Sequence, residues 1–294
     1  MLLRPLRLAA LLAVAVLVMS AIPASAAMRA HRTASAGVLA PAPLRAMWVW
    51  DRPGVASLVD FATSNGVGEL FVHVPSAPSL GWYTNLRTRT RAAGIEVHAL
   101  GSETWWIDDP EAAVAWQREV LATGLFDGVH LDIEPWLHAD WDADRSALLE
   151  RYLHLLDRMA ESPVPVELDI SFWLHEITAP DGGRLDEAVL ARVDAVTVMS
   201  YRDTATGPDS ITGLGGTALA AATRAGKPAR LAVETNDLGA TPVDAKQTFH
   251  GERRARLVNV LAQVDAAVAA NAAYAPSYAG IAVHDRRGWA AMKR

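Results

Sequence analysis

From residue 44 onward, short apolar runs alternate with longer stretches in which apolar residues recur at helical spacing. The short runs predict eight β-strands, at residues 45–50, 68–74, 95–100, 128–133, 164–172, 195–200, 229–234 and 280–284. Between them we expect helices, the clearest being one that begins at Asp109-Pro110-Glu111, one over 143–161 and one over 251–271. Eight strand–helix units over about 250 residues predict a single (β/α)8 TIM barrel spanning residues 44–294. A doubly wound parallel sheet is the alternative, but no Gly-rich phosphate loop follows the first strand.

The two faces of the predicted strands differ in polarity. One face is apolar in most strands, as at Leu70 and Val72, and is expected to pack under the outer helices. The other face carries polar or unusual side chains, namely His73, His98, His130, Asp132, Glu134, Glu167, Asp169, Ser171, Thr197, Met199, Tyr201, Glu234 and His284. These side chains should point into the barrel, and those near the C-terminal ends of the strands should lie where active sites of this fold lie.

The fourth predicted strand carries three ionisable side chains on one face. Its residues Val129, Leu131 and Ile133 are apolar and alternate with His130, Asp132 and Glu134. Three ionisable groups on one buried face are costly unless they are paired or used. The simpler interpretation is a structural polar network, and the functional one is a pair of catalytic carboxyl groups.

Tryptophans gather after the predicted strands. Those in predicted βα loops are Trp82, Trp105, Trp106, Trp136, Trp141 and Trp173, while Trp48 and Trp50 close the first strand. A tryptophan on a rim loop offers a flat apolar face to a ligand such as a sugar ring. The residues expected to bind substrate are Trp50, Trp105, Trp106, Trp136, Trp173, His130, Asp169 and Met199.

Composition narrows the class of function. Hydrophobic residues make up 51% and charged residues 20% of the 294 residues, which is typical of a folded domain with a large core. The formal net charge of −6, without a basic run beyond the N-terminus, argues against nucleic acid as a partner. The sequence contains no cysteine, so thiol nucleophiles and zinc–thiolate sites are excluded. No metal and no cofactor is expected.

The N-terminus has the features of a secretory signal peptide. Arg4 and Arg7 precede an apolar run over 8–19, which is short for a membrane span, and Ala24-Ser25-Ala26 supplies small residues for cleavage. We therefore expect a signal peptide over 1–26, a flexible lead-in over 27–43, and a secreted protein without stable membrane association. An uncleaved membrane anchor is the alternative.

Two motifs resemble a known family. The stretch Asp127-Gly128-Val129-His130-Leu131-Asp132-Ile133-Glu134 is similar to the fourth-strand motif Asp-Gly-x-Asp-x-Asp-x-Glu of the chitinase-like glycoside hydrolases of family 18. Met199-Ser200-Tyr201 resembles the Met-x-Tyr of that family's sixth strand. The resemblance implies that Glu134 is the general acid, that Asp132 holds the acetamido group of the substrate, and that Tyr201 hydrogen-bonds near the reacting centre.

The sequence departs from this family at several positions. His130 stands where the family has its middle Asp, and a protonated His130 would keep Asp132 ionised. Arg202 follows Tyr201 where the family usually has Asp, with Asp203 one residue later. The last strand ends in His284 where the family often has a Trp, leaving Trp289 as the nearest replacement.

A second resemblance points to a different mechanism. Glu134-Pro135 on strand four and Glu234 at the end of strand seven are similar to the acid/base and nucleophile of the clan A retaining glycosidases. Glu234 alternatively caps the loop that follows it. Both resemblances imply a polysaccharide or glycan substrate.

Two further functions remain open at the level of the sequence. His73, His98, His130, Asp132 and His284 are a candidate zinc or manganese site of a metallohydrolase, although the first strand lacks a His-x-His pair. A secreted carbohydrate-binding barrel without activity is the non-enzymatic alternative.

Overall fold

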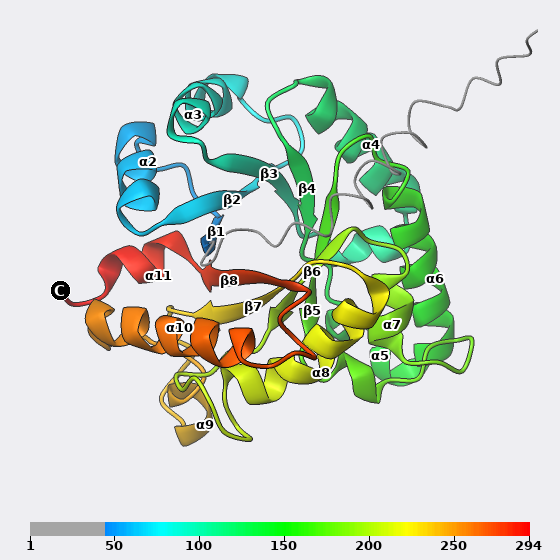
Figure 1. The fold of residues 1–294 in the computed structure, drawn as a ribbon. Coiled ribbons are helices and arrows are strands. Elements are labelled where there is room, and N and C mark those ends of the chain that lie inside the picture. Colours follow the sequence, from blue (N-terminus) through cyan, green and yellow to red (C-terminus); the bar gives the residue numbers. More distant parts are fainter. Residues whose placement is uncertain (1–44) are drawn as a thin grey trace, which may run out of the picture.

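The computed structural model describes residues 45–294, which form one closed barrel of eight parallel strands in sequential order (Figure 1). The strands are β1 (Arg45–Val49), β2 (Val67–His73), β3 (Glu96–Gly101), β4 (Gly128–Leu131), β5 (Val166–Ser171), β6 (Ala195–Met199), β7 (Ala229–Glu234) and β8 (Tyr278–His284). Each coincides with a predicted strand to within a few residues, so the predicted TIM barrel is confirmed. The fourth strand ends at Leu131, which leaves Asp132 and Glu134 just beyond it on the rim.

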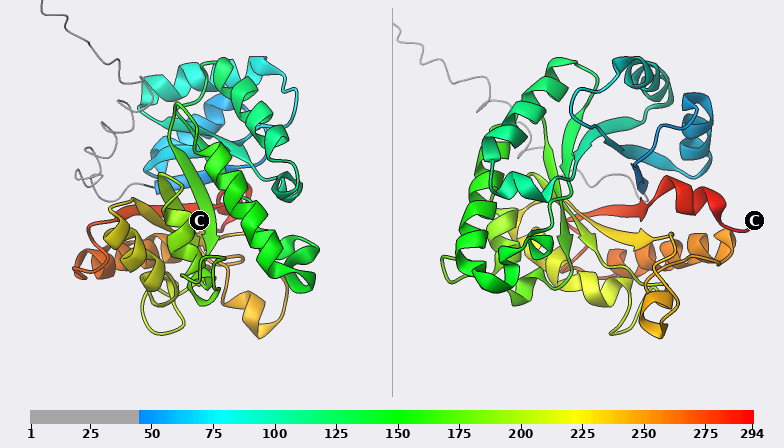
Figure 2. Two further views of the ribbon diagram at one scale, coloured as in Figure 1. Left: turned by 90° about the vertical axis from the view of Figure 1, so that its right-hand side faces the viewer. Right: turned by 180° about the vertical axis from the view of Figure 1, so that it is seen from behind.

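Helices surround the barrel on its outside, as the views from three sides show (Figures 1 and 2). They are α2 (Val55–Ser64), α3 (Leu80–Ala93), α4 (Pro110–Ala122), α5 (Asp140–Ala143), α6 (Arg145–Met159), α7 (Leu185–Leu190), α8 (Ile211–Ala225), α9 (Pro242–Ala245), α10 (Arg254–Ala269) and α11 (Arg286–Ala291). Short 3-10 turns, η1 (Thr104–Ile107), η2 (Pro135–Leu137) and η3 (Leu174–Glu176), follow β3, β4 and β5. The helix predicted over 143–161 is confirmed as α6, which begins two residues later because the Asp144 side chain caps it by accepting from Ala147 N at 3.2 Å.

Two apolar cores lie on the two faces of the strands. Leu70, Val72 and their counterparts on the other strands pack against the surrounding helices in one continuous cluster. A smaller cluster fills the barrel itself and consists of Ala46, Trp48, Phe71, Leu100, Ala232 and Ala282, with Trp50 and Tyr201 above it. The alternation of the sequence therefore gives the inward and outward faces correctly.

The N-terminal half of the barrel interior is charged rather than apolar. Arg230 of β7 binds Glu167 of β5 through Nη1 at 2.7 Å and pairs with Glu69 of β2 through Nη2. Thr197 donates its hydroxyl to Glu167, and His98 lies with Nδ1 2.9 Å from Glu69 Oε1. The Arg230 guanidinium and the His98 imidazolium thus offset the two buried carboxylates, which satisfies the rule that buried charges must be paired.

The Asp-Gly pair at the start of β4 has a structural role. Asp127 accepts from Val97 N at 2.9 Å and from Arg87 Nη1 at 2.5 Å, so it joins β3 and α3 and is remote from the rim. A Cβ on Gly128 would lie 2.8 Å from the imidazole of His98. Glycine at this position therefore makes room for the His98 ring.

The predicted signal peptide and lead-in, 1–43, lie outside the described residues. None of the helices within 45–294 is long and apolar enough to cross a membrane.

Candidate active site

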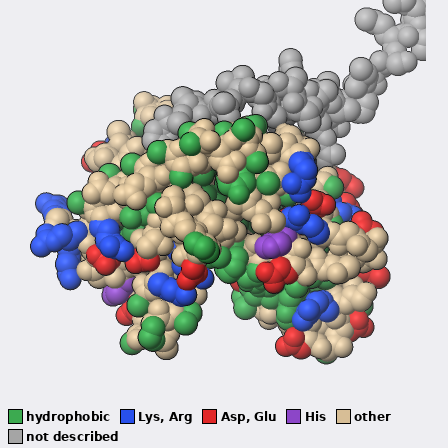
Figure 3. Space-filling view, turned by 60° about the horizontal axis from the view of Figure 1, so that its bottom comes forward, with side chains coloured by type: hydrophobic (Ala, Val, Ile, Leu, Met, Phe, Trp, Pro, Cys, Tyr) green, Lys and Arg blue, Asp and Glu red, His purple; other side chains and the backbone are tan. Residues whose placement is uncertain are grey.

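The C-terminal ends of the strands bring most of the predicted site residues together. Asp132 and Glu134 follow β4, Tyr201 follows β6, and Glu234 and His284 end β7 and β8. Figure 3 brings forward the end of the molecule that carries α5 and α9, which follow β4 and β7, and shows a hollow between two lobes with hydrophobic side chains along it. The C-terminal ends of the strands form the mouth of the barrel, where enzymes with this fold have their active sites.

Asp132 and Glu134 form a coupled pair of carboxyl groups. Burial, followed by the negative charge of Asp132, raises the pKa of Glu134 to about 7. Burial, followed by the charge of Asp169, raises the pKa of Asp132 to about 7. The two side chains share a hydrogen bond that favours the proton on Glu134, and the Trp136 indole donates to Glu134 as well. At neutral pH the pair therefore combines an acid and a carboxylate.

Asp169 of β5 lies beneath this pair. Its Oδ2 accepts from Trp48 Nε1 at 3.2 Å and lies 3.0 Å from His130 Nε2. Burial and the charge of Glu167 raise the pKa of Asp169 well above its usual value. Within the described chain, Asp132 Oδ1 and Asp169 Oδ1 are buried and lack a hydrogen-bond partner, which accords with the raised pKa values of both groups.

His130 does not have the predicted role in the site. It is fully buried inside the barrel, stacked on Phe71 with ring centroids 3.6 Å apart, and lies beside Asp169 and Glu167 instead of facing a ligand. Burial outweighs the nearby carboxylates and lowers the pKa of His130 to about 3. The expected contact of His130 with substrate is wrong, because the ring is inaccessible, and the ring is neutral rather than protonated.

Glu234 is held by four donors at the end of β7. Its Oε1 accepts from Thr235 N at 2.7 Å and from both nitrogens of Asn236, N at 2.7 Å and Nδ2 at 2.9 Å. Its Oε2 lies 2.7 Å from His284 Nδ1, and His284 Nε2 in turn accepts from Trp50 Nε1 at 2.9 Å. The carboxylate is 3% exposed, so the proposal of a loop cap describes its contacts better than that of a free nucleophile.

Tyr201 packs on top of the inner core beside His284, with ring centroids 6.3 Å apart. Burial and the charges of Glu234 and Asp169 raise the pKa of Tyr201 well above 10, so its hydroxyl stays a donor. Met199 ends β6 opposite Ser171.

Arg202 and Asp203 are both occupied by structural contacts. Arg202 donates to Asp209 and to the Tyr201 carbonyl, at 2.5 and 2.7 Å. Asp203 accepts from Arg256 Nη2 at 2.8 Å. Asp203 therefore does not supply the carboxylate that the family has directly after its tyrosine.

The predicted aromatic platforms fall into two groups. Trp105 is 51% exposed on η1, and Trp136 and Trp173 pack edge-to-face at 5.0 Å on the next part of the rim, both partly exposed. Trp106, in contrast, is 3% exposed and packs against Trp116, so it has no face for a sugar and the prediction for it is wrong. Trp82 lies in α3 rather than in a loop.

Trp48 and His284 are residues that the prediction of site residues omitted. Trp48 is buried and donates to Asp169, and His284 links Glu234 to Trp50. The alternation Ala46, Trp48, Trp50 along β1 is the sequence signal that identifies Trp48 as inward-facing. Trp289 packs outside the barrel against Phe61, so it does not take the place of a tryptophan in the barrel mouth.

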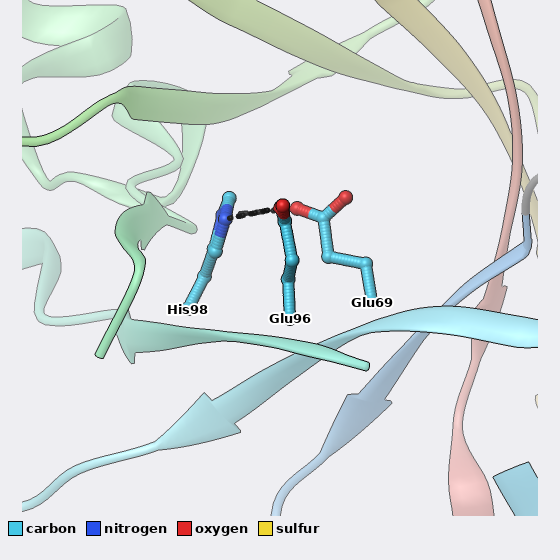
Figure 4. Close-up of side chains that lie close together, drawn as sticks. All are labelled: Glu69, Glu96 and His98. Carbon is cyan, nitrogen blue, oxygen red and sulfur yellow. Dashed lines mark ion pairs between the residues drawn. The ribbon is translucent and has the colours of Figure 1, made fainter. Parts of the chain in front are cut away.

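The charged floor is the set of charged side chains in the N-terminal half of the barrel, around Arg230. Among the described residues, Glu69, Glu96 and His98 of this region have the spacing of a metal site (Figure 4). The two carboxylates face different ring nitrogens, with Glu69 2.9 Å from Nδ1 and Glu96 3.7 Å from Nε2. Against burial, these carboxylates raise the pKa of His98 to about 10. The geometry fits an imidazolium between two carboxylates, with Arg230 already neutralising Glu69, better than a chelated cation. This set also differs from the five residues suggested by the sequence.

No protein-family model and no curated protein matches the chain. Solved barrels of similar fold include the Cellulomonas fimi endo-β-1,4-mannanase, with 11% identity over 89% of this chain and 67% of that one and a TM-score of 0.51. The Bacillus megaterium spore cortex-lytic enzyme SleL has 11% identity over 84% and 72% and a TM-score of 0.50. Catalytic domain 2 of the Ostrinia furnacalis group II chitinase has 11% identity over 65% and 63% and a TM-score of 0.42.

The similar structures thus include glycoside hydrolases of several kinds, but epimerase and synthase barrels occur among them too. At these identities the likeness shows the barrel fold and leaves the reaction to be argued from the site.

Proposed function

We propose that this protein is a glycoside hydrolase that cleaves a polysaccharide or glycan, with Glu134 as the general acid. The observation that carries the proposal is the Asp132–Glu134 pair, one carboxyl group of which holds a proton near neutral pH at the mouth of the barrel. A buried acid beside an ionised partner is the requirement shared by the glycosidase mechanisms. The partly exposed Trp105, Trp136 and Trp173 on the adjoining rim support sugar as the ligand.

For the mechanism we propose hydrolysis assisted by a 2-acetamido group of the substrate. The acetamido oxygen attacks the anomeric carbon, the glycosidic C–O bond breaks, and Glu134 gives its proton to the leaving oxygen. Ionised Asp132 accepts the acetamido N–H and stabilises the positive charge that develops on the ring formed. Water then attacks the anomeric carbon, Glu134 takes its proton, and the acetamido group is restored.

The contacts of Glu234 support this mechanism over a covalent one. A carboxylate nucleophile needs a free oxygen about 5–5.5 Å from the acid, facing the sugar. Both oxygens of Glu234 already accept hydrogen bonds, from Thr235 and Asn236 on one side and from His284 on the other. His130 is neutral, so it adds no positive charge beside Asp132, and the proton of the pair is shared between Asp132 and Glu134 alone.

The test is Glu134→Gln, assayed with fluorogenic glycosides that do and do not carry a 2-acetamido group. Loss of a positioned general acid should lower kcat by about 10²–10⁴-fold. The fold should persist, because the change removes an acid from a partly buried site without changing its size. Glu161→Gln, an exposed carboxyl at the end of α6, is the matched control and should retain full activity.

Three outcomes would contradict the proposed function or mechanism. Activity that survives Glu134→Gln would show that Glu134 is not the acid. A wild-type protein that binds glycans without cleaving any would be a carbohydrate-binding barrel. A sugar ester on Glu234 after treatment with a fluorinated activated glycoside would establish the covalent mechanism instead.

A further inference from the structure

Glu234, His284 and Trp50 form a continuous chain of hydrogen bonds along one side of the barrel mouth. Glu234 Oε2 lies 2.7 Å from His284 Nδ1, and His284 Nε2 lies 2.9 Å from Trp50 Nε1. The three residues come from β7, β8 and the end of β1, so the chain crosses the seam at which the barrel closes.

The direction of each hydrogen bond in this chain is fixed by chemistry. An indole N–H only donates, so His284 Nε2 must accept and carry no proton. The imidazole proton then lies on Nδ1 and is donated to Glu234, whose other oxygen is saturated by the N–H groups of Thr235 and Asn236. His284 is therefore the neutral Nδ1–H tautomer.

The charges around His284 favour its protonation, whereas burial and the hydrogen bond from Trp50 to Nε2 oppose it. Burial lowers the pKa of His284, but the Glu234 hydrogen bond and charge, with Asp285 and Asp132 further off, outweigh burial and raise it. A second proton on Nε2 would face the indole N–H directly. Two other rings pack on His284, Trp48 at 5.4 Å and Tyr201 at 6.3 Å between ring centroids, and within the described chain the hydrogen bond at Nε2 comes from Trp50.

Trp50 is the end of this chain and lies at the rim. It is partly exposed, rests on the inner core, and lies 5.5 Å from His73 in a tilted arrangement. The hydrogen bond from Trp50 Nε1 to His284 Nε2 is directional, so it fixes the orientation of the indole ring about its side-chain bonds.

We propose that Glu234 and His284 are positioning residues that hold the Trp50 indole in one orientation as a sugar-binding face. Glu234 acts by fixing the tautomer of His284, and His284 acts by accepting the indole proton. The role in sugar binding rests on the function proposed above, whereas the tautomer and the orientation of the ring do not.

Glu234→Gln gives an asymmetric prediction. The amide oxygen of Gln takes over the three N–H groups of Thr235 and Asn236, which leaves its NH2 group facing His284 Nδ1. That nitrogen must then accept, so the imidazole proton moves to Nε2, where it opposes Trp50 N–H. Trp50→Phe is the complementary change, since it keeps an aromatic face, keeps the Nδ1–H tautomer, and leaves Nε2 free to bind a proton.

The first experiment measures the tautomer directly by 15N NMR of the imidazole rings, with His284→Asn identifying the signal. Wild type should show Nδ1–H at neutral pH, Glu234→Gln should show Nε2–H, and Trp50→Phe should raise the pKa of His284. A wild-type His284 that is Nε2-protonated or imidazolium at pH 7, or a pKa unchanged by Trp50→Phe, overturns the chain without reference to any substrate. If Glu234→Gln does not fold, the wild-type and Trp50→Phe spectra still decide.

The second experiment uses the glycoside that wild type cleaves best. Glu234→Gln and Trp50→Phe should each raise KM by about 10-fold, with a smaller change in kcat, because they disturb a binding face. A 10³-fold loss of kcat in Glu234→Gln at unchanged KM, recovered by added azide, would make Glu234 the nucleophile and overturn its positioning role. If no glycoside is cleaved, the proposed function fails, and the NMR result stands by itself.

Discussion

Asp132 and Glu134 titrate as a pair, because the charge of Asp132 raises the pKa of Glu134 and their shared hydrogen bond favours the proton on Glu134. Catalysis by the proposed mechanism needs the state with one proton, in which Glu134 is the acid and Asp132 the carboxylate. As pH rises through about 7, Glu134 loses its proton and the productive state disappears. The basic limb of kcat/KM should accordingly lie near neutrality.

Asp132→Asn tests this coupling. Removing the negative charge of Asp132 lowers the pKa of Glu134, so the basic limb should move to lower pH, although burial still holds that pKa above its ordinary value. The rate should also fall by about 10²-fold because the acetamido group loses its charged partner. The pH profile of kcat/KM for both proteins provides the measurement, with Asp142→Asn, on exposed α5, as the unchanged control. A limb that stays in place or moves upward would mean that the two groups are not coupled.

For single residues, the sequence predicts which side chains share a face of a strand, but it does not predict their contacts with other strands. Strand alternation alone brings Asp132 and Glu134 to one side. The state of His130 depends on Phe71 from β2 and Asp169 from β5, and the capture of Glu234 depends on the two residues after it and on β8. These contacts join distant parts of the chain, so no local pattern reveals them.

The existence of each strand and helix follows from the local pattern of apolar residues, whereas the residue at which each one ends does not. All eight strands follow from apolar runs, but β4 stops at Leu131 where alternation continues to Glu134, because Pro135 begins η2. Trp82 lies within α3 because that helix begins already at Leu80. Trp106 is buried because η1 packs against α4, which brings Trp106 onto Trp116.

Gly128→Ala should destabilise the junction of β3 and β4. The new methyl group would lie 2.8 Å from the His98 ring, which is clamped between Glu69 and Glu96 and has little freedom to move. The expected cost is about 1–3 kcal/mol in the free energy of unfolding, measured by denaturant titration. Gly81→Ala in α3 is the control, because a Cβ there meets nothing within 4 Å and should be neutral or stabilising by up to about 1 kcal/mol. Equal behaviour of the two variants would contradict this account of Gly128.

The whole molecule is closed by pairs that join opposite ends of the described chain. Besides the β1–β8 ladder, Arg45 binds Asp265 of α10 at 3.1 Å, and Arg286 binds Asp51 at 3.0 Å. The count of strand–helix units predicts this closure, since eight units complete a barrel. Of the charged side chains in the N-terminal half of the barrel, the sequence predicts His98 and Glu167 as inward-facing, but it does not predict Glu69 and Arg230 there or the pairing of Arg230 with both carboxylates.

Export is the prediction that concerns the complete chain. We expect cleavage after Ala26, leaving 294 − 26 = 268 residues, because Ala24-Ser25-Ala26 follows a basic start and an apolar run. Intact mass and N-terminal sequencing of protein exported by a bacterial host provide the measurement. Ala24→Phe with Ala26→Phe should accumulate the uncleaved form. A mature protein that still contains residues 8–19 would refute the signal peptide and favour an anchor.

The single guanidinium on the barrel floor also limits how this fold can be recombined. Arg230 belongs to the second half-barrel and has carboxylates from both halves as partners, Glu69 from the first and Glu167 from its own. If the second half were replaced by that of a barrel with an aliphatic floor, Glu69 would lose its guanidinium partner and keep only His98 of its own half as a counter-ion. Chimeras of this protein should therefore be more stable with donors that carry a cation at the same level of β7 than with donors that do not.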